Sequence, residues 1–114
     1  MRNIGKVFRG KTKYIDLDDK PERNFVVVSD NGKSVGVAKL KGYKSEKKGL
    51  LKIDHKKYGL NKETGVDYQV FSKNRMSKKK LSLKDKKVFP EGKERFKFSS
   101  HDTHKILKHT KRIK

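Results

Sequence analysis

The side chains in this sequence that could do chemistry are mainly cationic, and one arginine holds a distinctive place among them. Arg23 stands at the head of the apolar run of residues 25–28. A second β-forming run follows the turn dipeptide Asn31-Gly32 and ends at Lys41. A guanidinium group meets two phosphate oxygens at once and stays charged, whereas a lysine ammonium is a point charge. Arg23 is therefore the best single candidate for handling a phosphate; the alternative is one solvated cation among many.

The other titratable side chains give weaker indications. His55 could act as a general base, although a surface histidine is the more common role. Asp16, Asp18 and Asp19 lack the ligand spacing of an EF-hand, so we interpret them as a turn that balances local charge. The sequence has no cysteine, which excludes disulfides, thiolate zinc sites and a cysteine nucleophile. It also has no Gly-rich phosphate loop and no catalytic-serine motif. We expect neither a metal ion nor a cofactor.

The charge of the chain points to a polyanionic partner. The net charge is +20, from 33 Lys and Arg against 13 Asp and Glu. Residues 70–114 carry 16 basic and 4 acidic side chains, a net +12, whereas residues 1–69 carry 17 and 9, a net +8. Neutralising phosphates releases counterions, so nucleic acid is the expected partner. An anionic membrane surface and a role in solubility alone are the weaker alternatives.

The pattern of apolar residues predicts a small mainly β domain that spans residues 1–114. We expect strands over residues 13–17, 25–28, 35–40, 50–54 and 66–71, because each is short, rich in β-formers and bounded by turn residues. The run at 25–28 is continuously apolar, which indicates a central strand buried on both faces. Short strands at this spacing favour an antiparallel barrel over about residues 11–90.

A basic helix is predicted over about residues 100–113. Ser99 or Ser100 caps it, and Asp102 three residues beyond Ser99 resembles a capping box. An apolar face recurs at helical spacing, and it consists of Thr103, Ile106, Leu107, Thr110 and Ile113. The chain has neither an apolar stretch of membrane-spanning length nor the apolar core of a signal peptide. We expect a cytoplasmic protein.

Five segments, taken in order, resemble the MazF/PemK family of toxin endoribonucleases. They are YIDLD at 14–18, RNFVVVSD at 23–30, VGVAKLKG at 35–42, IDHKKYGL at 53–60 and VDYQV at 66–70. The second segment is similar to the family's Arg-Pro strand motif, with Asn24 in place of the proline. The resemblance implies a small SH3-like antiparallel β-barrel of the MazF/PemK/CcdB type with a C-terminal α-helix, in most members a homodimer.

The resemblance also implies an activity. The family cuts single-stranded RNA without a metal, by attack of a 2′-hydroxyl on the adjacent phosphate to give a 2′,3′-cyclic phosphate. Arg23 matches the family's catalytic arginine, Lys41 takes the place of its threonine, and Phe71 takes the place of a second arginine. Catalytic residues would then be Arg23 with Lys41, and His55 as a proton carrier. An acidic antitoxin peptide would be a partner.

Two further hypotheses stay open at this point. The chain could be a non-catalytic nucleic-acid-binding or regulatory module on the same barrel, or a basic inhibitor that docks on an acidic partner. Phe71 could stack on a base, as aromatic side chains do with single-stranded RNA. The residues that we predict to bind RNA are Lys39, Lys44, Gln69, Phe71, Lys73, Arg75, Lys78, Lys79 and Lys80.

Overall fold

The computed structural model describes residues 3–43 and 49–111, and these residues form one antiparallel sheet with three short or medium helices. The strands are β1 (Lys6–Lys11), β2 (Glu22–Asp30), β3 (Val35–Gly42), β4 (Leu50–Ile53), β5 (Thr64–Phe71) and β6 (Phe96–Lys97). The helices are α1 (Thr12–Ile15), the 3-10 helix η1 (His55–Tyr58) and α2 (Ser100–Lys111). The strands lie in the order β4-β5-β3-β2-β1-β6, and every neighbouring pair is antiparallel.

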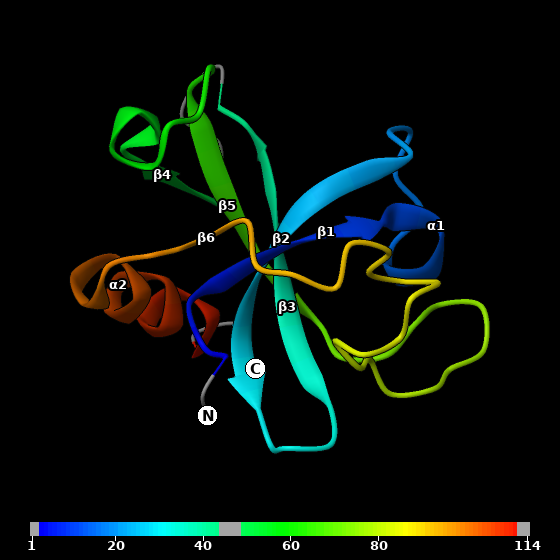
Figure 1. Ribbon diagram of the computed structural model, residues 1–114. Helices are drawn as coiled ribbons and strands as arrows, with labels where there is room; N and C mark the ends of the chain where they lie inside the picture. The colour runs from blue at the N-terminus through cyan, green and yellow to red at the C-terminus, as the bar shows by residue number, and fades with distance from the viewer. Residues whose placement is uncertain (1–2, 44–48, 112–114) are drawn as a thin grey trace.

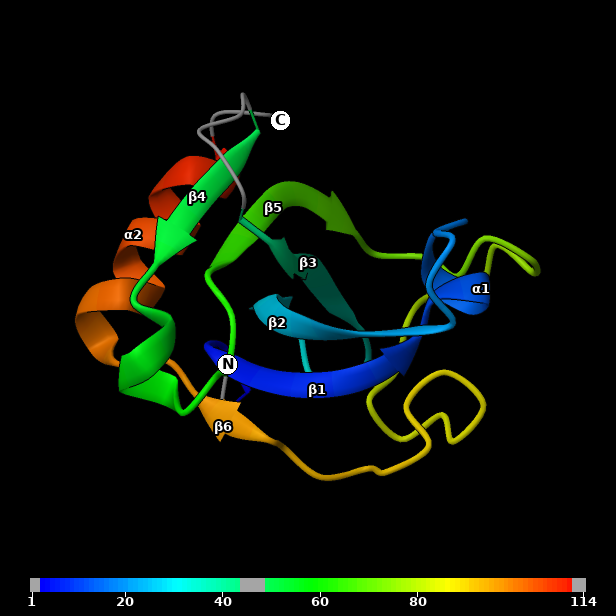
Figure 2. The same cartoon turned by 90° about the horizontal axis from the view of Figure 1, so that it is seen from above.

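The sheet is curled into a half-barrel, with α2 on one side and α1 on the other (Figure 1). Figure 2, seen from above, shows the same separation and the bend of the strands between the two sides. The predicted mainly β class, a small SH3-like antiparallel barrel with a C-terminal helix, is therefore confirmed. The predicted strands at residues 50–54 and 66–71 correspond to β4 and β5.

Both faces of the curled sheet are covered, which explains the continuous apolar run at the centre of β2. Val26 and Val28 join an apolar cluster that includes Ile106 of α2. Phe25 and Val27 join a second cluster, which α1 and the segment of residues 72–95 close with Ile15, Leu81, Val88 and Phe89. All four residues of the run are buried, so the prediction of a strand buried on both faces is confirmed.

The predicted strand over residues 13–17 is wrong, because that segment begins with the helical turn α1. The strand that pairs with this part of β2 is β1, where Phe8 lies opposite Phe25 and Lys11 opposite Glu22. Since β1 already uses this edge of β2, the chain turns at Thr12, whose amide donates to the Pro21 carbonyl at 3.1 Å. The alternating pattern of residues 13–17 is too short to separate a strand from one helical turn that buries Ile15.

The helix α2 begins where the sequence predicts and covers the sheet with the predicted face. The hydroxyl of Ser99 accepts a hydrogen bond from the Asp102 amide at 3.2 Å, as an N-cap does. Ile106 and Thr110 are buried, and Leu107 packs at the rim of the first cluster. The last two residues of the predicted helix, 112 and 113, lie outside the described residues, and with them Ile113 of the predicted apolar face. Over residues 3–43 and 49–111, no helix has both the length and the apolar character needed to cross a bilayer.

Candidate nucleic-acid interface

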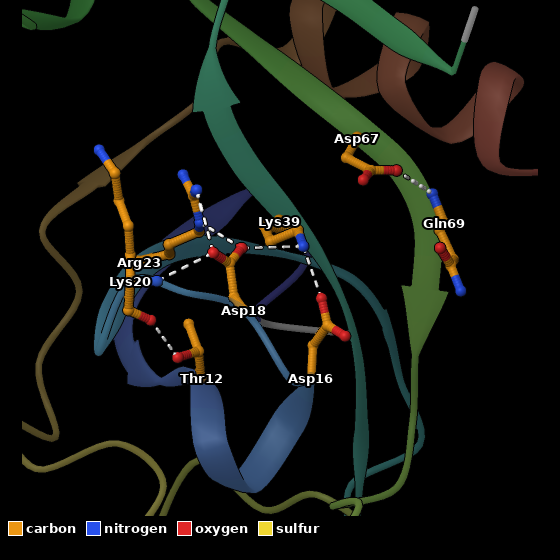
Figure 3. A network of polar contacts seen from close by, with 8 residues as sticks. All are labelled: Thr12, Asp16, Asp18, Lys20, Arg23, Lys39, Asp67 and Gln69. Atoms are coloured by element: carbon orange, nitrogen blue, oxygen red, sulfur yellow. Dashed lines mark hydrogen bonds and ion pairs between the residues drawn. The ribbon is translucent and has the colours of Figure 1, made fainter.

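Arg23 lies in a largely buried ion cluster between α1, β2 and β3 (Figure 3). Its Nε donates to Oδ2 of Asp18 at 2.6 Å, and its Nη2 donates to Oδ1 at 3.2 Å. The ammonium of Lys39 donates to Asp16 at 2.5 Å and to Asp18 at 3.1 Å. The cluster thus contains two cations and two carboxylates. Two of the three acidic residues that we interpreted as a charge-balancing turn, Asp16 and Asp18, are its anionic half.

The cluster shifts the pKa values of Asp18 and Lys39, in each case in the direction that favours the charged form. Burial opposes the ionisation of Asp18, but hydrogen bonds from Arg23, the Lys20 amide and Lys39 outweigh it and hold the pKa of the carboxyl far below its usual range. Burial would lower the pKa of Lys39, yet Asp16 and Asp18 together raise it. Arg23 and Lys39 are therefore committed to internal carboxylates.

The strand β5 carries a bulge opposite Lys39. Ala38 pairs with Val70 and Lys39 with Asp67, so Tyr68 and Gln69 have no partner on β3. The Gln69 amide freed by the bulge donates instead to the Asp67 carboxylate at 3.2 Å, as Figure 3 shows. The Nζ of Lys39 also lies 6.0 Å from the centre of the Phe71 ring. Of the predicted RNA-binding residues, Lys39 is buried and Phe71 half-buried against it, whereas Gln69 is exposed.

The structure brings two of the three predicted catalytic residues together. Arg23 and Lys41 line one hollow of about 270 Å³ at the end of the β2–β3 pair, and Thr64 on β5 lines it as well. The side-chain amide oxygen Oδ1 of Asn24, another lining residue, is buried with no hydrogen-bond partner in the described part of the chain. His55 lines a different hollow, beside Lys52 and Lys56. The predicted group of Arg23, Lys41 and His55 is therefore not a single constellation.

The exposed cations concentrate on the loops that cover the second apolar cluster. Residues 73–87, which we name the basic loop surface, carry eight basic side chains and one acidic one. The eight are all exposed, and they are Lys73, Arg75, Lys78, Lys79, Lys80, Lys84, Lys86 and Lys87. The first five were predicted to bind RNA. Lys44, the remaining predicted residue, lies outside the described residues.

Short-range hydrogen bonds order the basic loop surface. Lys73 and Lys80 form a β-bridge, and the Asn74 amide donates to the Lys79 carbonyl at 2.8 Å within it. The buried Asn74 accepts from the Ser77 amide at 2.8 Å and from its hydroxyl at 2.5 Å. The turn takes Lys78 to a φ of 57°, in the left-handed region. These contacts hold the cations on a fixed frame.

A hollow of about 470 Å³ lies within the basic loop surface and beside α1. Its lining joins the two loops, with Met76 and Lys79 from one, Lys86 and Lys87 from the other, and Tyr14 from α1. The sequence prediction did not include Tyr14, Lys86 or Lys87 among the binding residues. The run of cations in residues 73–87 was the available signal, but the contribution of α1 depends on the tertiary contact between the Arg75 amide and the Tyr14 carbonyl, at 2.9 Å.

Comparisons of the sequence with protein-family models and with curated proteins find no match. The resemblance to the MazF/PemK family therefore stays a prediction. The site must be argued from its own geometry and charge.

Proposed function

We propose that the chain is a non-catalytic nucleic-acid-binding protein that docks through the basic loop surface. The observation that carries this proposal is the set of eight exposed basic side chains in residues 73–87, against the single acid Asp85. Oδ1 of Asp85 accepts a hydrogen bond from the Lys87 amide at 3.0 Å, so its charge is partly used inside the turn. Phosphates that meet this surface would release counterions. A cytoplasmic location fits such a partner.

Binding is better supported than cleavage because the arginine expected to act on a phosphate is already engaged. Arg23 donates through two nitrogens to Asp18, and its side chain is only 12% exposed. Lys41 offers a point charge where the MazF/PemK resemblance asks for a hydroxyl. His55 lines a separate hollow, so it is not placed to transfer a proton directly to a substrate bound beside Arg23.

One observation favours a second candidate, the metal-independent endoribonuclease toxin. Arg23, Lys41 and Thr64 line a single hollow, and Thr64 supplies a hydroxyl there from a neighbouring strand. That hydroxyl donates to the Lys62 carbonyl at 2.9 Å. In this candidate, Arg23 would exchange Asp18 for the phosphate, and an acidic antitoxin peptide would cover the basic groups.

A cleavage assay combined with a binding assay separates the two candidates. The full chain is incubated in EDTA with a long single-stranded RNA, and the products are examined for 2′,3′-cyclic phosphate ends. We expect binding that weakens steeply with added salt and no fragments. Fragments that disappear with Arg23→Ala, in a variant whose circular dichroism shows that it stays folded, would establish the endoribonuclease instead. Failure to bind RNA or DNA at low salt would overturn both candidates.

A further inference from the structure

We propose that the hollow in the basic loop surface receives one unpaired base of a nucleic-acid strand, while lysines at its rim hold the flanking phosphates. This inference rests on the proposed function and adds the form of nucleic acid that the same surface selects. The hollow measures about 470 Å³, which lies in the ~300–1,000 Å³ range of small-molecule sites.

The lining combines two chemistries that a nucleotide also combines. Tyr14, Met76 and Val88 supply aromatic, thioether and aliphatic surface. Lys79, Lys86 and Lys87 supply positive charge at the same hollow. A base offers a flat polarisable face to the first group, and its phosphates offer charge to the second. A plain phosphate-binding surface would need the lysines alone.

Met76 is the observation that points beyond simple charge attraction. Its side chain is 72% exposed in a loop that is otherwise polar or cationic. Within the described chain, Leu17 is the other large hydrophobic side chain with comparable exposure, at 62%, and it does not line the hollow. When a ligand covers a long apolar side chain that is otherwise exposed to water, the loss of exposed apolar surface favours binding. Its place between cations indicates a ligand with both an apolar face and negative charge.

The side-chain oxygens of Asn74 and Asp85 in the lining already accept hydrogen bonds within the protein, so they contribute little to base-specific recognition. The Asn74 oxygen is used by Ser77, and Asp85 accepts from the Lys87 amide. We therefore expect recognition by stacking and charge, with little preference among the four bases. The loop frame is fixed before binding by the bond from the Asn74 amide to Lys79 and the bond from the Arg75 amide to Tyr14. Such preorganisation lowers the entropy that binding must offset.

An unpaired base fits this hollow where a duplex does not. In a duplex each base is stacked between its neighbours, and the backbone alone meets the protein unless a base leaves the stack. The rim lysines bind either form of nucleic acid through phosphates. Selection between the forms therefore depends on the apolar lining, and the test must separate the lining from the charge.

The test measures fluorescence anisotropy of labelled strands with the full chain at fixed salt. The probes are an RNA and a DNA strand of ~12 nucleotides, within the site sizes of single-strand binders. A duplex of the same sequence and a strand of abasic units with the same phosphates complete the set. The variants are Met76→Ser and its matched control Leu17→Ser, with Lys79→Gln and its matched control Lys78→Gln, since Lys78 does not line the hollow.

We expect the strands with bases to bind at least about fivefold more tightly than the abasic strand, which is the lower end of base–aromatic stacking. Met76→Ser should remove most of that preference, and Leu17→Ser should leave it in place. Lys79→Gln should weaken single strands more than Lys78→Gln does. RNA and DNA strands that bind alike point to a site that reads base and phosphate without the 2′-hydroxyl.

Two outcomes overturn the inference, and they are distinguishable from failure of the proposed function. Equal affinity for the abasic strand and the strands with bases, in the presence of salt-dependent binding, removes the base site and leaves the proposed function standing. A base preference that Met76→Ser does not change also removes the site. Absence of binding to every probe overturns the proposed function and this inference with it.

Discussion

Arg23 and Asp18 form a two-point ion pair, with 2.6 Å from Nε to Oδ2 and 3.2 Å from Nη2 to Oδ1. Their side chains are only 12% and 5% exposed. A carboxylate meets the guanidinium fork in the same bidentate way as a phosphate does. The arginine that the sequence marks for a phosphate is thus occupied by an internal anion, and this relationship moves the expected interface to the basic loop surface.

Removing the Asp18 charge should strongly destabilise the fold. Asp18→Asn leaves Arg23 and Lys39 with Asp16 as the remaining carboxylate of the cluster. Breaking a buried ion pair by removing one partner costs about 3–5 kcal/mol, because a buried charge stays uncompensated. Urea denaturation measures the loss. The matched control is Glu91→Gln, which removes an exposed partner of Arg95 and should cost less than about 1 kcal/mol. Equal losses would contradict a structural role for the cluster.

Acid should destabilise the protein through the same carboxylate. The pKa of Asp18 is lowered on folding, as is that of Asp102, through hydrogen bonds from Tyr58 and Lys57 that outweigh burial. A lowered folded pKa stabilises the fold in full above the unfolded pKa of ~3.9, and the stabilisation is lost as the pH falls through the folded pKa. The free energy of unfolding should therefore fall below about pH 5. Asp18→Asn should show a smaller fall between neutral pH and acid; an unchanged fall would refute the assignment.

The hydroxyl of Tyr58 should contribute measurably to the docking of α2. It donates to Asp102, and it accepts from the Ser99 amide at 3.0 Å, while its ring stacks 5.4 Å from Phe96. Tyr58→Phe keeps the ring contacts and removes the polar ones, so we expect a loss of about 2 kcal/mol. Thermal unfolding followed by circular dichroism checks this. Tyr43→Phe is the control, since within the described chain the Tyr43 hydroxyl makes no hydrogen bond; a similar loss there would argue against the Tyr58 bonds.

A methyl group at Gly10 should be poorly tolerated where β1 meets α1. A Cβ at this position would stand 2.9 Å from Cδ1 of Ile15 and 3.0 Å from Cδ2 of Phe25. Crowding in a packed cluster costs about 1–3 kcal/mol, so Gly10→Ala should lower the free energy of unfolding by that amount. At Gly42 an added Cβ meets no atom within 4 Å. Gly42→Ala should therefore leave the free energy of unfolding almost unchanged. If Gly10→Ala were as stable as Gly42→Ala, the second apolar cluster would have relaxed around the added methyl group, contrary to the prediction.

The fold was largely predictable from the sequence, because its central strands carry strong signals. The apolar run at residues 25–28, the Asn31-Gly32 turn and the apolar face of α2 all correspond to observed elements. The first and last strands along the chain, β1 and β6, were missed. The sequence of β1 has only two apolar residues, Val7 and Phe8, and its other four positions are basic or glycine; β6 has only two residues, so neither strand gives a clear period.

The candidate site was less predictable, because it depends on pairing across the fold. Lys39 follows Val37 by two residues and so shares its buried face, which was a readable sign that its ammonium needs an internal anion. The anions are Asp16 and Asp18, more than twenty residues away. Lys73, Arg75 and residues 78–80, which we predicted to bind RNA, are exposed, because a cation on a loop needs no tertiary partner. Their role in binding stays a prediction.

The central claim is that nucleic acid docks on residues 73–87, and matched charge removal tests it most directly. One variant replaces Lys78, Lys79 and Lys80 with glutamine. The control replaces three exposed lysines on the side of α2 and η1, which are Lys56, Lys105 and Lys108 (Figures 1 and 2). Both variants carry the same net charge, so a difference between them reports position alone.

The measurement is the slope of log affinity against log salt for a single-stranded RNA. Each phosphate contact contributes about −0.7 to that slope, so loss of three contacts should reduce its magnitude by about 2 in the first variant. The control should keep a slope within about 1 unit of the unmodified protein. Equal reductions in the two variants, or none in the first, would contradict docking on the basic loop surface.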